Sequence, residues 1–431
     1  MYTIEKQNGK VLYTDTEEKR SLLINEENFM GMFETENPEA VKAENIKSLV
    51  VDQPIGCEKL SEIVAKKNAK TACIIVSDAT RGVPTAKVAP FILEELNKGG
   101  IKDENIVFVV ALGVHRDATE DEMKVFVGEE IYSKYRMENH RPFDEEHLVY
   151  LGETSRKTPV KVNKTVYESD IVVTVGKVEL HDMAGFSGGR KSILPGVSSE
   201  ETIVINHRPE MMEHPCSYSG NLEGNPIHLD MLETAQMCGV DYTVNVVMNK
   251  DYEIAGIFAG ELDAAHRKAA EFLKLNCNIA LPEKPDVYVV CPGDPLNIDM
   301  YQGVKAIIAL RPVADETSTV VLYGNFTEGI NSTDFVEPFK MFEDLADVKK
   351  YVWDNYEIQM DHIIPIRDML VKGVKFIVVS ENVTEEEIKT LRMEKAETLQ
   401  QAVDMAIAEK DGKARVAICP QSYRGIISIP E

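Results

Sequence analysis

Short β-branched runs that alternate with helical patterns are the feature that most constrains the fold of this chain. Between them lie helix-like segments such as 85–100, where Gly99 and Gly100 are expected to end the helix as a C-cap. Seven runs are typical of buried strands: TACIIV (71–76), NIVFVVAL (105–112), DIVVTVG (170–176), DVYVVC (286–291), STVVLYG (318–324), VKFIVVS (374–380) and ARVAIC (414–419). Strands that alternate with helices favour parallel sheets. The sequence therefore predicts an α/β fold.

Domain boundaries are indicated by one proline-bearing stretch. Residues 273–286, LKLNCNIALPEKPD, follow a helix-like segment and contain two prolines, so we expect an interdomain hinge there. This predicts an N-terminal domain over 1–275 and a C-terminal domain over 283–413, each with a largely parallel sheet flanked by helices. A second crossing near 409–416 would return the last segment, 414–431, to the first domain.

Composition excludes several classes of function. The 431 residues are 44% hydrophobic and 28% charged, which is typical of a globular chain, and no apolar run is long enough to span a membrane. A formal net charge of −25 repels nucleic acid and anionic lipid, so we expect neither as a partner. The N-terminus, MYTIEKQNGK, lacks the features of a signal peptide, and the seven cysteines contain no C-x-x-C pair. A cytoplasmic location with free, buried cysteines is the expectation.

Polar loops follow four of the predicted strands, and ligands of open α/β sheets gather at the carboxyl ends of strands. The first loop holds Asp78 and Arg81, whose planar fork suits a carboxylate or a phosphate. The second presents His115 after Gly113, and a histidine there can move a proton in either direction. Each loop also has a purely structural interpretation, as an ion pair with Thr80 as a helix cap and as a structural histidine.

The third loop, 179–196, reads ELHDMAGFSGGRKSILPG and is the most specific signal in the chain. Its glycines, Gly188 and Gly189 among them, allow close approach of a ligand, and Ser187 with the backbone amides could hold a phosphate. The loop matches neither the Walker A pattern nor G-x-G-x-x-G. Lys191 could lose its charge by desolvation and act as a nucleophilic amine, or it could be an ordinary surface lysine.

Two further clusters complete the set of candidate site residues. His207, in NHRPE, joins His115 and His181 as a possible metal ligand or acid–base group, although the spacing alone does not name a metal. Beyond the hinge, Gln302 and Lys305 in YQGVK are three residues apart and would share one face of a helix. They could bind a hydroxyl and an anionic group, or they could simply be solvated.

Taken together, these segments resemble the lactate racemase family. The segments that carry the resemblance are SDATRGVP, GVHRDAT, HDMAGFSGGRKSILPG, NHRPE and DMYQGVK, in family order over roughly residues 70 to 305. The third of them is highly distinctive, and the joint pattern is difficult to obtain by chance.

The resemblance implies a cofactor and a division of labour. The cofactor would be the nickel-pincer nucleotide (pyridinium-3-thioamide-5-thiocarboxylic acid mononucleotide nickel complex). It would be held in a cleft between a cofactor-binding N-terminal domain and a closing C-terminal domain. The roles implied are covalent attachment at Lys191; cofactor binding by Asp78, Ser187, Gly188 and Gly189; nickel ligation by His207; catalysis by His115 and His181; and substrate binding by Arg81, Tyr301, Gln302 and Lys305.

The implied reaction is racemisation of a short 2-hydroxyacid, with lactate first, by proton-coupled hydride transfer. The α-hydrogen of such an acid is a poor proton donor, so removal as hydride while a base takes the hydroxyl proton avoids a dianionic enolate. Cofactor biosynthesis proteins are the implied partners, and protein made without them is expected to lack the cofactor. Oligomeric state is left open.

Three alternatives stay open at this point. The same cofactor could act on malate, 2-hydroxyglutarate, another 2-hydroxyacid or a sugar acid, and Arg116 or Arg190 could serve a second carboxylate. The chain could instead be a noncatalytic ligand-binding relative. A zinc hydrolase that uses the three histidines lacks ligand spacing on a helix and a clear general base.

Overall fold

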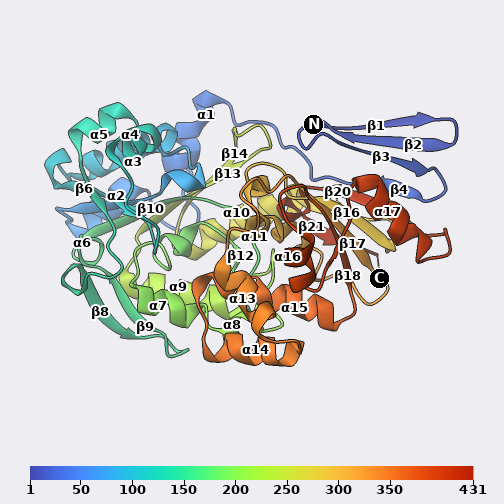
Figure 1. The fold of residues 1–431 in the computed structure, drawn as a ribbon. Coiled ribbons are helices and arrows are strands. Elements are labelled where there is room, and N and C mark those ends of the chain that lie inside the picture. The colour runs from blue at the N-terminus through green and yellow to red at the C-terminus, as the bar shows by residue number, and fades with distance from the viewer. Residues whose placement is uncertain (431) are drawn as a thin grey trace. The chain divides into compact units, whose positions relative to one another are not determined.

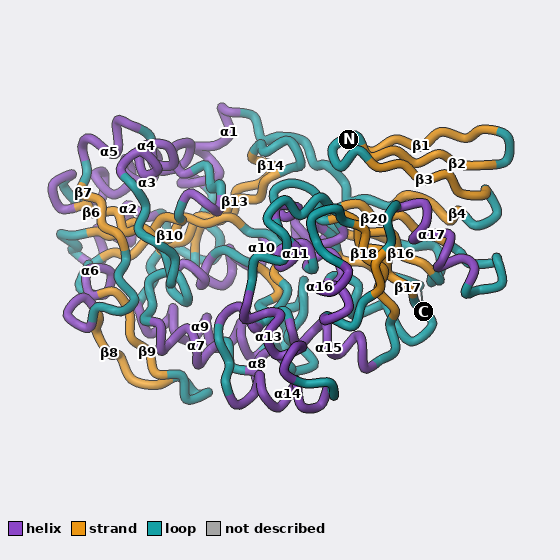
Figure 2. Tube along the Cα trace, in the orientation of Figure 1, coloured by secondary structure: helices purple, strands orange, loops and turns teal. Residues whose placement is uncertain are grey.

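The chain forms two compact units. The computed structural model describes residues 1–430 and, within them, every side chain except that of Ile358. One unit is Asn37–Asn276, here called the central unit, and the other joins Met1–Glu36 to Cys277–Glu431 and is called the terminal unit. In both units helices surround a sheet, as Figures 1 and 2 show, and the α/β prediction is confirmed.

The sheet of the central unit has six strands in the order β14-β13-β10-β5-β6-β7. Neighbouring strands run parallel except for β13 and β14, so the expectation of a largely parallel sheet is confirmed here. Their bounds are β5 Ala72–Ser77, β6 Ile106–Ala111, β7 Arg136–Asn139, β10 Ile171–Lys177, β13 Tyr242–Met248 and β14 Ile254–Gly260. Since β5 lies between β6 and β10, the loops that follow these three strands leave the sheet side by side.

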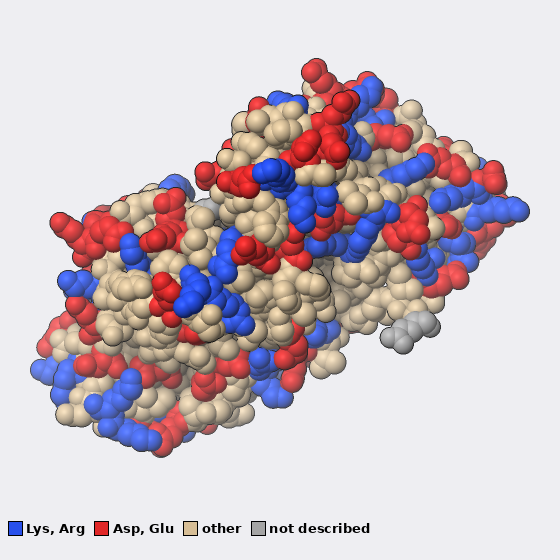
Figure 3. Space-filling view, turned by 90° about the horizontal axis from the view of Figure 1, so that it is seen from below, with Lys and Arg blue, Asp and Glu red and all other residues tan. Residues whose placement is uncertain are grey.

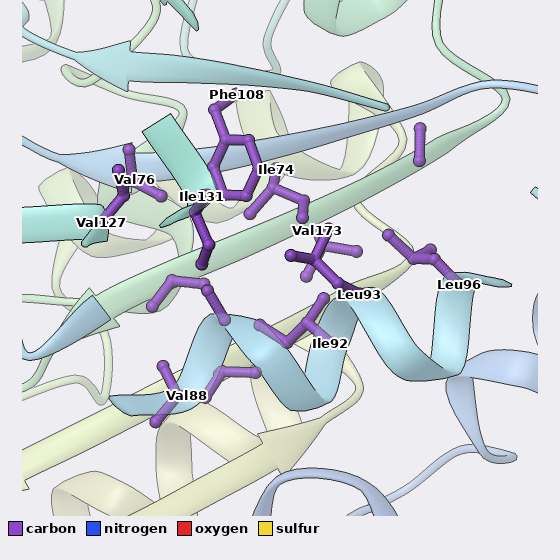
Figure 4. Close-up of a cluster of buried hydrophobic side chains, with 14 of the residues drawn as sticks. Ile74, Val76, Val88, Ile92, Leu93, Leu96, Phe108, Val127, Ile131 and Val173 are labelled. Atoms are coloured by element: carbon purple, nitrogen blue, oxygen red, sulfur yellow. The ribbon is translucent and has the colours of Figure 1, made fainter. Parts of the chain in front are cut away.

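The β-branched runs are apolar throughout because both faces of this sheet are covered. Side chains of β5 alternate: Ile74 and Val76 point into one core, and Cys73 and Ile75 point into another. On the first face, Figure 4 shows Val88, Ile92 and other side chains of α3 Thr85–Gly99 packed toward Ile74, Phe108 and Val173 of the strands. This helix ends as predicted, because Gly100 adopts a left-handed conformation (φ 109°) and its N–H donates to the carbonyl oxygens of Leu96 and Asn97.

The remaining elements of the central unit cover the two faces and build the loops. The helices are α1 Ala43–Lys47, α2 Leu60–Lys67, α4 Glu120–Val127, α5 Glu129–Lys134, α6 Lys164–Tyr167, α7 Glu200–Asn206, α8 Pro209–Met212, α9 Pro226–Cys238 and α10 Leu262–Asn276. Two antiparallel hairpins add β8 Leu148–Glu153 with β9 Pro159–Asn163, and β11 Leu180–His181 with β12 Gly185–Phe186.

The terminal unit has a six-stranded, fully parallel sheet in the order β19-β18-β17-β16-β20-β4. These strands are β4 Phe29–Met32, β16 Val287–Cys291, β17 Thr319–Tyr323, β18 Lys375–Val379, β19 Glu394–Lys395 and β20 Val416–Pro420. A short parallel pair joins β15 Asn278–Ala280 to β21 Ile426–Ser428. The helices are α11 Met300–Gly303, α12 Lys305–Ile308, α13 Thr333–Met341, α14 Leu345–Asp354, α15 Ile363–Val371, α16 Glu385–Thr390 and α17 Leu399–Ala408.

The domain assignment from the sequence differs from the structure at both ends of the chain. The first 36 residues belong to the terminal unit, because the meander β1 Tyr2–Gln7, β2 Lys10–Asp15 and β3 Arg20–Asn25 adds apolar side chains to that core and β4 pairs with β20. Strand β20 lies between β16 and β4, and the last strand, β21, pairs with β15, so 414–431 does not return to the first domain. The chain passes from α10 into the terminal unit after Asn276, within the stretch where the hinge was expected.

No helix within residues 1–430 is long and apolar enough to cross a membrane. On the face drawn in Figure 3, Lys and Arg side chains are interspersed among Asp and Glu.

Candidate active site

Three neighbouring strands of the central unit deliver most of the candidate residues. Asp78 and Arg81 follow β5, His115 follows β6, and the 179–196 loop follows β10. His207 arrives differently, as the C-cap residue of α7. Because carboxyl ends of adjacent parallel strands share one edge, the fold gathers these side chains at that edge.

His115 is held by a buried carboxylate. Its Nδ1 lies 2.9 Å from Oδ2 of Asp78, while Oδ1 of the same carboxylate accepts a hydrogen bond from the Thr80 backbone N–H. Arg81 Nη2 lies 3.4 Å from His115 Nε2. A guanidinium can only donate, so these partners assign the proton to Nδ1 and leave Nε2 as an acceptor. This is the orientation of a histidine general base supported by a carboxylate.

The carboxylate of Asp78 stays ionised. Burial by itself raises the pKa of Asp78, but the hydrogen bonds from His115 and Thr80 and the charge of Arg81 outweigh it and bring the pKa to about 2. An ionised partner stabilises the imidazolium that forms when His115 takes a proton.

His181 has partners for both of its protonation states. Its Nδ1 lies 3.1 Å from Asp182 Oδ1 and 3.4 Å and 3.3 Å from the backbone nitrogens of Met183 and Ala184. Protonated, Nδ1 can donate to the carboxylate, and unprotonated, it can accept from the amides. Its Nε2 lies 3.1 Å from Lys191 Nζ. His181 therefore has a carboxylate and an amine within reach of its two ring nitrogens.

Lys191 has a strongly perturbed amine. Burial, followed by the positive charges of Arg190 and Arg81, lowers the pKa of Lys191 to about 7, and Asp182 acts in the opposite direction. A large fraction of this lysine is therefore uncharged at neutral pH, which is the state in which an amine is nucleophilic.

The ring of His207 is oriented as in many metal-binding histidines. Its Nδ1 lies 3.0 Å from the carbonyl oxygen of Ile203, one turn earlier, and the carbonyl can only accept. The proton is therefore on Nδ1, and Nε2 carries its lone pair. Burial, followed by the charge of Lys191, lowers the pKa of His207 to about 4, so the ring is neutral at pH 7.

The glycines and the serine of the loop are engaged within the protein. Ser187 Oγ donates to the carbonyl of Lys177 and accepts from the Glu179 N–H, both at 2.8 Å. Gly188 has φ 77°, and a Cβ there would lie 2.6 Å from Val178 Cγ2. The Gly189 N–H donates to Asn245 Oδ1 at 2.9 Å. These contacts explain the local sequence, and binding of a cofactor by Ser187, Gly188 and Gly189 stays a prediction.

Tyr301, Gln302 and Lys305 lie in the terminal unit. Lys305 Nζ donates to Gln302 Oε1 at 2.8 Å, so the two side chains share a face as expected. Tyr301 donates its hydroxyl to Asp361 and packs its ring against His362, with ring centroids 4.5 Å apart. Their role toward the residues of the central unit stays a prediction.

Two residues that support the site, Asp230 and Asp182, were not predicted from the sequence. Asp230 is fully buried and accepts hydrogen bonds from Thr154, Thr158 and Asn206. Asn206 is the last residue of α7, so this network fixes the helix end that carries His207. An aspartate within the apolar segment PIHLDML was the available signal. Asp182 was also missed, although it directly follows His181.

Metal binding by protein side chains alone finds no support. Within residues 1–430, no group of three or more His, Cys, Asp or Glu side chains is arranged to hold a metal ion. The three histidines therefore do not form the set of ligands that the zinc alternative requires.

An α/β unit that gathers two acid–base histidines, a perturbed lysine and a neutral histidine at one sheet edge has the parts of a proton-transferring enzyme. The sequence model of the lactate racemase N-terminal domain matches residues 15–220, and that of the C-terminal domain matches 282–427. The chain is 31% identical to the lactate racemase of Lactiplantibacillus plantarum over 392 residues, covering 88% of this chain and 89% of that protein. It belongs to the lactate racemase family.

Two further comparisons agree. The lactate racemase of Thermoanaerobacterium thermosaccharolyticum is 30% identical over 393 residues, covering 89% of this chain and 90% of that protein. The structure of the lactate racemase apoprotein from that organism has a TM-score of 0.87 at 27% identity and covers 99% of this chain and 100% of its own. A Thermotoga maritima protein at 17% identity, with a TM-score of 0.66 and 91% of this chain covered against 100% of its own, shares the fold.

Proposed function

We propose that the protein is a racemase of a short 2-hydroxyacid, with lactate as the first candidate. The observation that carries this proposal is a pair of histidines at one sheet edge: His115, whose Nδ1 bonds Asp78 and whose Nε2 lies beside Arg81, and His181, whose Nε2 lies beside Lys191. A racemase must serve two opposite faces of a carbon, and two acid–base histidines meet that need. The relatives named lactate racemase support the same conclusion.

The residues present fit the nickel-pincer nucleotide that the family resemblance implies. His207 offers a neutral imidazole whose Nδ1–H is bonded to Ile203, which is how metal-binding histidines are usually oriented. Lys191 offers an amine with a pKa of about 7 for covalent attachment. When bound, the cofactor supplies the capacity to accept the C2 hydrogen as hydride and to return it.

The chain's own residues would do the remaining work. His115 and His181 hold or take the proton of the substrate hydroxyl, each for one enantiomer. Arg81 binds the substrate carboxylate with its planar fork. Gln302 and Lys305 bind substrate from the terminal unit. Cofactor biosynthesis proteins as partners and a cytoplasmic location belong to the same proposal.

The substrate is expected to carry one carboxylate. Of the two basic residues considered for a second carboxylate, Arg116 is bound by both carboxylate oxygens of Glu122, at 2.9 Å and 2.6 Å, and Arg190 is 1% exposed. A pocket of about 590 Å³ beside His115 includes Arg141. Its wall also carries four acidic residues, Asp117, Asp144, Glu145 and Glu146. Such a wall disfavours a second negative charge.

The test is a comparison of substrates on loaded enzyme. The protein is co-produced with the cofactor biosynthesis enzymes, and kcat/KM is measured for L- and D-lactate, malate, 2-hydroxyglutarate and gluconate. Lactate is expected to be the best substrate. A preference for a dicarboxylate by more than about tenfold, or about 1.4 kcal/mol, contradicts the choice of substrate. Absence of racemisation by protein that carries cofactor and nickel contradicts the racemase and supports a noncatalytic relative.

A further inference from the structure

A buried arginine next to Lys191 has no role in the proposed chemistry. Arg190 is 1% exposed, and no ion pair among residues 1–430 includes it. Burial lowers the pKa of Arg190 to about 9 while the charge of Asp263 acts in the opposite direction, and a buried cation also needs good hydrogen-bond acceptors around it. The hydrogen-bond acceptors around its guanidinium indicate a structural role for Arg190.

The acceptors come from the loop that carries Lys191. Arg190 Nη2 donates to the Ala184 carbonyl at 2.9 Å, and Nη1 lies 3.4 Å and 3.3 Å from the carbonyls of Ser187 and Gly188. One guanidinium thus contacts three backbone carbonyls within the segment between His181 and Lys191. We propose that Arg190 is a positioning residue that fixes this loop and thereby sets the reactivity of the Lys191 amine, without touching substrate or cofactor.

His266 of α10 packs against Arg190 and the loop. Its Nε2 lies 2.7 Å from Arg190 Nη1 and 2.9 Å from the carbonyl oxygen of Ser187, so this ring contacts both the guanidinium and the loop. Burial, followed by the charge of Arg190, places the pKa of His266 well below its ordinary value, so the ring is neutral beside the guanidinium. A Cβ on Gly189 would lie 3.1 Å from the ring, and His228 stacks on it at 6.2 Å between centroids. The guanidinium is therefore held from the core side as well.

The electrostatic consequence follows from proximity. Lys191 faces the charges of Arg190 and Arg81, the opposing carboxylate of Asp182, and two histidines, His181 and His207. After burial, Arg190 is the largest cause of the lowered pKa of Lys191. The guanidinium thus shapes the loop and keeps the amine largely uncharged near neutrality. The importance of this amine rests on the proposed function.

The experiment uses protein without cofactor, so that it does not depend on turnover. The acetylation rate of Lys191 by acetic anhydride is followed by peptide mass spectrometry from pH 6 to pH 9.5, in wild type, Arg190→Met and Arg190→Lys. The wild-type midpoint is expected near pH 7. Arg190→Met should raise it by about one unit or more, which is at least about a fivefold loss of reactive amine at pH 7. Arg190→Lys keeps the charge, so its midpoint should stay closer to that of wild type.

A matched control and a second measurement keep the test decisive. Arg208 also binds backbone carbonyls, of Ile205 and Arg156, but not those of the loop, so Arg208→Met should leave the midpoint unchanged. If Arg190→Met does not fold, hydrogen exchange of amides 184–191 in Arg190→Lys decides, and it should speed up about tenfold because an ammonium cannot reproduce the fork. An unchanged midpoint in folded Arg190→Met, or unchanged exchange in Arg190→Lys, overturns the proposal. Neither result bears on racemisation, so the two proposals fail separately.

Discussion

Replacing Lys191 with alanine is expected to abolish the covalent adduct of protein co-produced with the cofactor biosynthesis enzymes. The reason is chemical: Lys191 has an amine with a pKa of about 7 because of burial and two nearby guanidinium groups, and it lies 3.1 Å from His181. An ordinary lysine amine is protonated at neutral pH and does not attack a carbonyl or thiocarbonyl carbon. Intact-mass spectrometry should show one adduct per wild-type chain and none in Lys191→Ala.

Lys177 provides the control for this variant. It ends β10, beside the same loop, but its ammonium is paired with Glu179 at 2.8 Å. Lys177→Ala should therefore carry the same adduct as wild type. Detection of that adduct in Lys191→Ala would remove the assignment of the attachment site.

The three histidines are expected to separate into two classes. His207→Ala should lose nickel. Of these three histidines, His207 is the one whose Nδ1–H is bonded to a backbone carbonyl, and this bond leaves the lone pair of Nε2 for a metal. His115→Ala and His181→Ala should retain nickel and lose turnover by about 10²–10⁴-fold, the usual contribution of a general acid or base. Nickel per chain by elemental analysis and racemisation rate on the same preparations provide the two measurements.

His147 is a suitable control because it is an exposed histidine paired with Asp144 at 2.8 Å and does not itself line the pocket beside His115. His147→Ala should retain both nickel and turnover. Equal nickel loss in His115→Ala, His181→Ala and His207→Ala would show that the roles have been divided wrongly.

The candidate site was accessible from the sequence because its information is local. A polar loop directly after a buried strand must lie at the carboxyl edge of a sheet, and all seven predicted strands are strands in the structure. The order of strands in a sheet depends on contacts between distant parts of the chain. The local sequence around Asp78, His115 and Lys191 therefore does not predict that β5 lies between β6 and β10. Their proximity is therefore a result of the structure.

Sheet membership is the part of the fold that the sequence did not predict. The strand over 416–420 has the same β-branched pattern as the others, and its two partner strands lie about 130 and nearly 390 residues earlier in the sequence. Burial of polar side chains was equally inaccessible. Arg190 looks like a surface cation in the sequence, but the carbonyls of Ala184, Ser187 and Gly188 and the ring of His266 accommodate it inside.

The central claim is that the hydrogen at C2 leaves and returns as hydride while His115 and His181 handle only the hydroxyl proton. The most direct test is racemisation of L-lactate carrying deuterium at C2, by loaded enzyme in ordinary water. A hydrogen that is transferred as hydride does not exchange with solvent, so the D-lactate formed should retain deuterium at C2. D-lactate that has acquired hydrogen from water at C2 would mean that a base removes a proton from carbon, which contradicts the proposed mechanism.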